Sequence, residues 1–124
     1  MVIRVRRLPG PFAGFQGVCC WPFILIRADC PDEEGLLIHE RVHFREQRAC
    51  LLLPWLLLYL LSRRFRLAAE ARAFAAQIRA GHIDLSDAAA CLTRYRLGIT
   101  RTQARAALER RLGLPARPVP PPHA

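Results

Sequence analysis

Residues 36–50 read LLIHERVHFREQRAC, and this stretch decides the fold because its apolar and charged residues recur with the period of an α-helix. At about 100° per residue, His39 and His43 lie about 40° apart on the same side of the helix as the apolar residues. Three arginines fall on the opposite side: Arg41, Arg45 and Arg48. We therefore expect a helix that begins near Leu36, turns both histidines into the protein and exposes its arginines to water.

A buried pair of histidines at positions i and i+4 of one helix suits a metal ion. The two imidazoles lie one above the other, and their buried ring nitrogens need partners, one of which a metal supplies. His39 to His43 also form the pattern HExxH, in which Glu40 is the general base beside two zinc ligands. The sequence predicts one zinc ion here; the alternative is that neighbouring side chains satisfy both histidines.

A third ligand has to come from elsewhere, because catalytic zinc takes three protein ligands and keeps one position open. Glu70 is the best candidate, since it flanks an apolar stripe on the helix expected over residues 66–80, where an unpaired carboxylate is costly. The alternative is a glutamate at the solvent edge that binds Arg66. His82 and Asp84, beyond the end of that helix, are weaker candidates.

The segment HERVHFREQ, followed after an apolar helix by AAEARAF, resembles the gluzincin-type zinc metallopeptidases, particularly minimal bacterial versions. In these, a glutamate on the next helix completes the HExxH site. The likeness covers roughly residues 36–76. It implies peptide-bond hydrolysis of a peptide or protein substrate, with Glu40 as general base and three zinc ligands: His39, His43 and Glu70. The family's oxyanion-stabilising tyrosine or histidine has no matching motif.

The N-terminal part of the chain is expected to form strands. Residues 2–8 alternate apolar residues with arginine before a Pro-Gly-Pro turn, and residues 18–27 form a second candidate strand, which Pro22 confines to an edge or a bulge. The resemblance implies that this edge strand holds an extended peptide beside the active-site helix. We therefore expect an α+β fold, with a small N-terminal sheet packed on that helix and mostly helices thereafter, a minimal zincin-like domain.

An uncharged, almost wholly apolar run covers residues 49–61 and contains Pro54. A helix of these 13 residues is about 20 Å long, whereas the hydrocarbon core of a bilayer is about 30 Å thick. We expect a buried core helix. The alternative is peripheral contact with a membrane, with Trp55 and Tyr59 at the level of the headgroups.

Ser86 and Thr100 are expected to cap two C-terminal helices. We interpret these helices as a pair that covers the core through Leu92, Leu97, Ile99, Ala104 and Leu108. The alternative is a DNA-binding helix-turn-helix with four arginines near phosphate: Arg101, Arg105, Arg110 and Arg111. Residues 1–114 are then one domain, and the proline-rich residues 115–124 an extended or disordered tail.

Composition sets the remaining expectations. The net charge of +9 suggests an anionic partner, but all 19 basic residues are arginine, so compositional bias explains much of it, and nucleic acid is not the expected partner. Five cysteines without a CxxC pair indicate no disulfide framework. Without a signal-like segment, we expect a cytoplasmic protein; the alternative is one that is also associated with a membrane surface. A non-catalytic zinc-binding interaction protein is the alternative to an enzyme.

Overall fold

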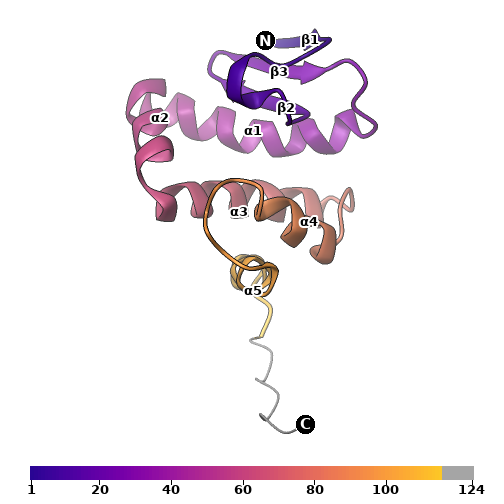
Figure 1. Cartoon of the computed structure of the whole chain (residues 1–124), viewed down its shortest axis with the longest axis vertical. Helices are drawn as coiled ribbons and strands as arrows, with labels where there is room; N and C mark the ends of the chain where they lie inside the picture. Colours follow the sequence, from indigo (N-terminus) through magenta and orange to yellow (C-terminus); the bar gives the residue numbers. More distant parts are fainter. Residues whose placement is uncertain (116–124) are drawn as a thin grey trace, which may run out of the picture.

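The computed structural model describes residues 1–115 and has an α+β fold. Most of the proline-rich tail predicted for residues 115–124 lies outside the described residues. The elements are β1 (Val2–Val5), a short 3-10 helix (Gly10–Phe12), β2 (Gly17–Cys20), β3 (Phe23–Arg27), α1 (Glu33–Cys50), α2 (Leu52–Leu61), α3 (Arg63–Arg79), α4 (Leu85–Leu92) and α5 (Arg101–Leu112). The sheet packs on α1, α1 lies beside α3, and α4 and α5 cover the far side of α3 (Figure 1).

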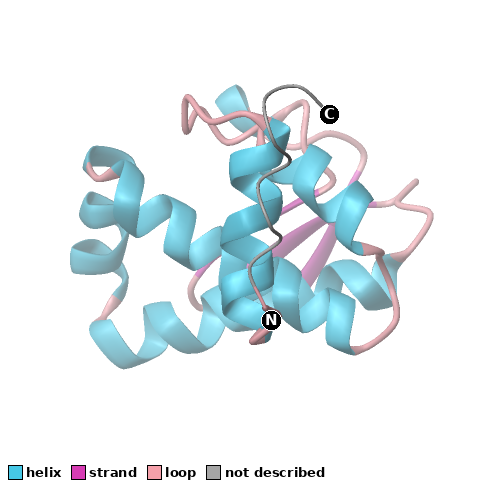
Figure 2. Cartoon of the chain, turned by 90° about the horizontal axis from the view of Figure 1, so that it is seen from below, coloured by secondary structure: helices cyan, strands magenta, loops and turns pink. Residues whose placement is uncertain are grey.

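The sheet has the strand order β1-β3-β2, with β1 parallel and β2 antiparallel to the central strand β3. The single edge strand predicted over residues 18–27 was wrong, because this segment is a hairpin. Pro22 lies in its turn, where no hydrogen bond of the sheet has to be donated. The helices lie on one side of the sheet (Figures 1 and 2), and the strands bury Cys19, Ile24 and Ile26 beneath α1. The prediction of a small sheet packed on the histidine-bearing helix is confirmed.

Helix α1 begins at Glu33, three residues earlier than predicted. The Asp32 side chain accepts a hydrogen bond from the backbone N–H of Gly35, which satisfies one free donor at the helix start, and two acidic residues occupy the first turn. The predicted orientation is confirmed, since both histidines are buried and all three arginines are exposed. The helix ends at Leu51, whose φ of 58° departs from helical geometry.

Helix α2 connects the ends of α1 and α3, so that these two long helices run antiparallel (Figure 1). Pro54 lies in the first turn of α2, where its missing N–H has no helical partner to lose. The prediction of a buried core helix over residues 49–61 was wrong: Trp55 is the buried residue of α2, whereas most of its leucines are exposed. The reason is that α2 spans the ends of two helices and packs on them with one side. Within the described chain, no helix has the length and apolar character that crossing a membrane requires.

The C-terminal helices cover α3, as expected. Leu92, Leu97, Ala104 and Leu108 are buried with Phe74 of α3 in one apolar cluster, and Ile99 packs against it. Thr100 caps α5 through a reciprocal capping box with Gln103, as predicted. Helix α4 starts two residues earlier than expected, because Asp84 and not Ser86 is its N-cap.

Candidate metal centre

Two neighbouring helices bring the three predicted ligands together. His39 and His43 project from α1, and Glu70 projects from α3 across the gap between the helices. Their ligand atoms all lie within 4.8 Å of one another, and the three side chains are buried. We call them the ligand group. The structure thus contains a possible metal-binding group made of the residues that the sequence predicted, and the surface position considered for Glu70 was wrong.

The distances within the ligand group fit a small divalent ion. His39 Nε2 lies 3.0 Å from one oxygen of Glu70, and His43 Nε2 lies 3.1 Å from the other. Ligand atoms about 2.1 Å from one tetrahedral zinc ion are about 3.4 Å apart, close to both values. Both ring nitrogens of His43 are inaccessible to solvent; Nε2 has only its contact with the Glu70 carboxylate, and Nδ1 has no hydrogen-bond partner within residues 1–115. A buried nitrogen without a hydrogen-bond partner is what a metal ligand leaves in a protein fold.

The charges of the site also favour a cation. Glu40 is buried beside the ligand group, so two carboxylates, Glu40 and Glu70, lie in the same water-poor region. The pKa of Glu40 is raised, mainly because burial disfavours the charged carboxylate. The two histidines lower this pKa and Glu70 raises it, and the effect of burial is the largest. A divalent cation would balance the two negative charges, which otherwise require protons or cationic histidines.

Protons and a metal ion would compete for His43. Burial lowers the pKa of this imidazole, but the Glu70 carboxylate raises it more, to about 9. For Glu70, burial raises the pKa, and the two histidines outweigh this and hold it well below its usual range. The carboxylate is therefore ionised and ready to bind a cation.

Two further side chains orient the ligands, and sequence reasoning missed both. The Nδ1 atom of His39 lies 2.7 Å from Oε1 of Gln77, so an Nδ1–H donates to this oxygen and Nε2 is left for a metal. The hydroxyl of Tyr59 donates to Glu70 Oε1 over 2.7 Å. Gln77 follows Glu70 by seven residues on the same face of α3, which is a signal that the sequence contains. Tyr59 has no such signal, because its position depends on how α2 packs.

Trp55 supports the same region from α2. Its ring stacks on Tyr59 with centroids 4.9 Å apart and lies 5.5 Å from the ring of His43. Its indole N–H donates to Glu46, which also binds Arg72 of α3 through two hydrogen bonds. The two aromatic residues that were considered as membrane contacts therefore face the ligand group instead.

Gln47 links the histidine helix to the sheet. Its amide accepts a hydrogen bond from the backbone N–H of Trp21 and donates to the backbone carbonyl of Cys19, and its side chain is fully buried. These two bonds fix the distance between α1 and β2. The two weaker ligand candidates have other roles, since His82 binds the side chain of Asp32 and Asp84 caps α4.

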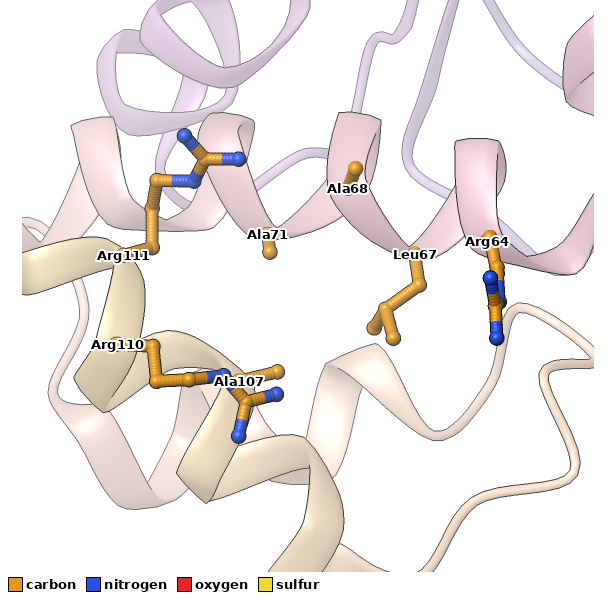
Figure 3. A pocket seen from close by; sticks show the side chains of 7 residues that line it. All are labelled: Arg64, Leu67, Ala68, Ala71, Ala107, Arg110 and Arg111. Atoms are coloured by element: carbon orange, nitrogen blue, oxygen red, sulfur yellow. The ribbon is translucent and has the colours of Figure 1, made fainter. Parts of the chain in front are cut away.

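A cavity of about 300 Å³ opens beside the site. Its walls include His39 and Glu40 of α1, the backbone region of Gln16 and Gly17 at the start of β2, and Tyr95. A second cavity of about 320 Å³ lies between α3 and α5 and is lined by Arg64, Leu67, Ala68, Ala71, Ala107, Arg110 and Arg111 (Figure 3). None of these lining residues is a typical metal ligand or a nucleophile. The cavity beside Glu40 is therefore the one that chemistry at the ligand group could use.

Comparisons with protein-family models, with curated proteins and with solved structures found no match to this chain.

Proposed function

We propose that the chain is a zinc-dependent hydrolase that cleaves peptide bonds, with a minimal zincin-like arrangement of the gluzincin type. The proposal rests on one observation: Glu40 is buried directly beside the ligand group, and both Glu40 and His39 border the same cavity. Two histidines with one carboxylate form a common ligand set of catalytic zinc, which leaves a coordination position open.

The chemistry follows from the roles of these side chains. Zinc held by these residues would supply Lewis acidity toward water and the substrate carbonyl. The Glu40 carboxylate would accept a proton from the attacking water and pass it to the leaving amine. His39, His43 and Glu70 hold the ion, while Gln77 and Tyr59 keep two of these ligands oriented.

The proposed substrate-binding site is the edge strand β2. Strand β2 pairs with β3 on one side, and the cavity that borders Glu40 reaches its first residue, Gly17. Gln47 already occupies the carbonyl of Cys19 and the N–H of Trp21, so an extended peptide could add to the open edge of β2 only at its start, near Gly17, and place one carbonyl near the ligand group. Gln47 would keep this strand at a constant distance from the histidine helix.

Tyr95 is the proposed donor to the oxyanion. It borders the cavity, and its hydroxyl makes no hydrogen bond within residues 1–115, whereas the hydroxyl of Tyr59 is committed to Glu70. Burial and the nearby carboxylates raise the pKa of Tyr95 well above 10, so the phenol stays protonated and able to donate. Tyr95→Phe is expected to lower kcat about 100- to 1,000-fold with unchanged zinc content.

The decisive experiment compares three variants with the zinc-loaded wild type on a library of fluorogenic peptides. Glu40→Gln should keep zinc and lose at least about 99% of the hydrolysis, because the base is gone and the ligands remain. His43→Ala should lose both. Glu34→Gln, an exposed glutamate on the same helix, is the matched control and should keep both.

Two results would contradict the proposal. Hydrolysis retained by Glu40→Gln would remove Glu40 as the base. Stoichiometric zinc in the wild type, with no cleavage above the chelator-treated sample across the library, would instead indicate a non-catalytic zinc-binding protein.

A further inference from the structure

The outer side of α2 carries an apolar surface that the metal site does not use. Trp55 and Tyr59 occupy the inner side of this helix, against His43 and Glu70. The outer side exposes five leucines, each by at least 50% and Leu61 by 81%: Leu53, Leu57, Leu58, Leu60 and Leu61. Most large apolar side chains that the described chain exposes lie on or next to this helix, so the surface is concentrated and not scattered.

The shape of this surface fits a bilayer better than a second helix. At about 100° per residue, the five leucines cover an arc of about 160°, from Leu60 to Leu58. A helix that pairs with another helix needs only a narrow seam of apolar positions. Helix α2 lies at one end of the molecule, where it joins α1 to α3 (Figure 1), so its convex outer side is free to meet a flat surface.

The exposed charges that flank α2 in the sequence are all positive. Arg48 precedes the helix and Arg63 and Arg64 follow it, Arg64 also lining the cavity between α3 and α5, and residues 47–69 contain no aspartate or glutamate. None of these three guanidinium groups forms an ion pair within residues 1–115. A band of leucine bordered by unpaired arginine is complementary to the acyl chains and anionic headgroups of a membrane surface.

We infer that α2 is an interfacial helix that docks the protein onto an anionic lipid bilayer. The ten residues of α2 form a helix about 15 Å long, which lies in the plane of the interface with its leucines inserted and its arginines among the headgroups. This inference does not depend on the proposed hydrolysis, because it uses the outer side of α2.

Vesicle co-sedimentation of the zinc-loaded protein tests this inference. Vesicles of phosphatidylcholine with added phosphatidylglycerol should bind the wild type, and phosphatidylcholine vesicles should bind it at least about tenfold more weakly. The double variant Leu57→Asp/Leu60→Asp should lose at least about tenfold in affinity for the anionic vesicles. Leu114→Asp, which alters an exposed leucine after α5, is the matched control and should bind as the wild type does.

The arginines are tested in the same assay. Arg63→Gln/Arg64→Gln should weaken binding to anionic vesicles about tenfold, and the difference should shrink as salt is added. Arg101→Gln, an exposed arginine at the start of α5, should have a much smaller effect.

A second measurement does not require a disruptive substitution. Leu57→Trp keeps an apolar side chain, and its fluorescence should shift to shorter wavelength with anionic vesicles and be quenched by brominated acyl chains. Leu114→Trp should show neither change. Absence of quenching at Leu57→Trp in a protein that co-sediments would overturn insertion.

Two other outcomes would overturn the inference. Vesicle binding that is equal in the wild type and in Leu57→Asp/Leu60→Asp would show that charge alone attracts the protein. The other outcome is a wild-type protein that does not bind vesicles but forms a concentration-dependent dimer in sedimentation velocity. If the two substitutions dissociated that dimer, the leucines would be assigned to contact with a second copy of the chain.

Discussion

The two sides of α3 pack in different ways. Toward α1, α3 contributes Glu70 and Gln77, which meet His39 and His43 in a polar layer. Toward α4 and α5, it contributes Ala71 and Phe74 to an apolar layer, and the ring of Phe74 also reaches the polar layer, where it lies 4.4 Å from the ring of His39. An apolar layer stabilises the fold by burial alone, whereas a polar layer costs free energy unless every group finds a partner. The apolar layer therefore stabilises the fold, whereas the polar layer holds the possible metal-binding group.

Of the changes considered, removing the metal should alter protein stability most, and it should act on the polar layer alone. Free zinc at a thousand times its dissociation constant should stabilise the protein by about 4 kcal/mol, and chelator should abolish this gain. Thermal denaturation followed by circular dichroism measures both states. Glu70→Ala should melt at the same temperature with and without zinc. If this variant bound zinc with wild-type stoichiometry and affinity, Glu70 would not be a ligand.

Shortening a side chain in the apolar layer should give the converse result. Leu108 of α5 is fully buried in that layer, so Leu108→Ala should reduce the free energy of unfolding by about 3 kcal/mol through lost burial and a cavity. Urea denaturation should give equal losses with zinc and with chelator, and the zinc affinity of the folded variant should be unchanged. Leu114→Ala, at an exposed position, should cost little. A tenfold fall in the zinc affinity of Leu108→Ala would show that the two layers are coupled.

Changing a supporting residue of the polar layer should have a smaller effect. Gln77→Leu removes the acceptor for Nδ1–H of His39 and should weaken zinc binding about tenfold or more. Competition with a fluorescent chelator measures this affinity. Gln77→Glu keeps an acceptor oxygen and should bind zinc at least as tightly as the wild type. Equal weakening in both variants would mean that Gln77 acts through packing and not through the hydrogen bond.

The smallest effect is expected at an exposed polar contact outside both layers. Asp32 caps α1 and binds His82, and the hydrogen bond from Gly35 together with His82 lowers its pKa despite the opposing effect of partial burial. A carboxyl group whose pKa is lower in the folded than in the unfolded protein contributes to stability. This contribution is fully present above the unfolded pKa of about 3.9, and it is lost as the pH falls through the folded pKa.

The variant Asp32→Asn keeps a capping oxygen but loses this charge. It should therefore be slightly less stable than the wild type near about pH 6, and the difference should vanish toward about pH 2. Urea denaturation in chelator measures it without interference from zinc release. A difference that grows in acid would have the wrong sign for this contact.

Local patterns predicted the parts of the site that lie on one helix. The spacing of His39 and His43 placed both on the inner side of α1, and the three arginines of that helix marked the outer side. The position of Glu70 came from an apolar stripe and from a family resemblance, and its pairing with α1 could not follow from local spacing. Two errors have a common cause: neither the hairpin at Pro22 nor the exposure of α2 can be inferred from one segment without its neighbours.

By itself, the sequence determined the helix that carries HExxH, the orientation of its two histidines and the capping of α5 by Thr100. These depend on interactions a few residues apart, whose geometry the helix period sets. Only the tertiary structure decided that Gln77 and Tyr59 hold two of the ligands, and that the leucines of α2 face outward. Which side of a short apolar helix is buried depends on what packs against it, and in α2 the ends of α1 and α3 cover one side alone.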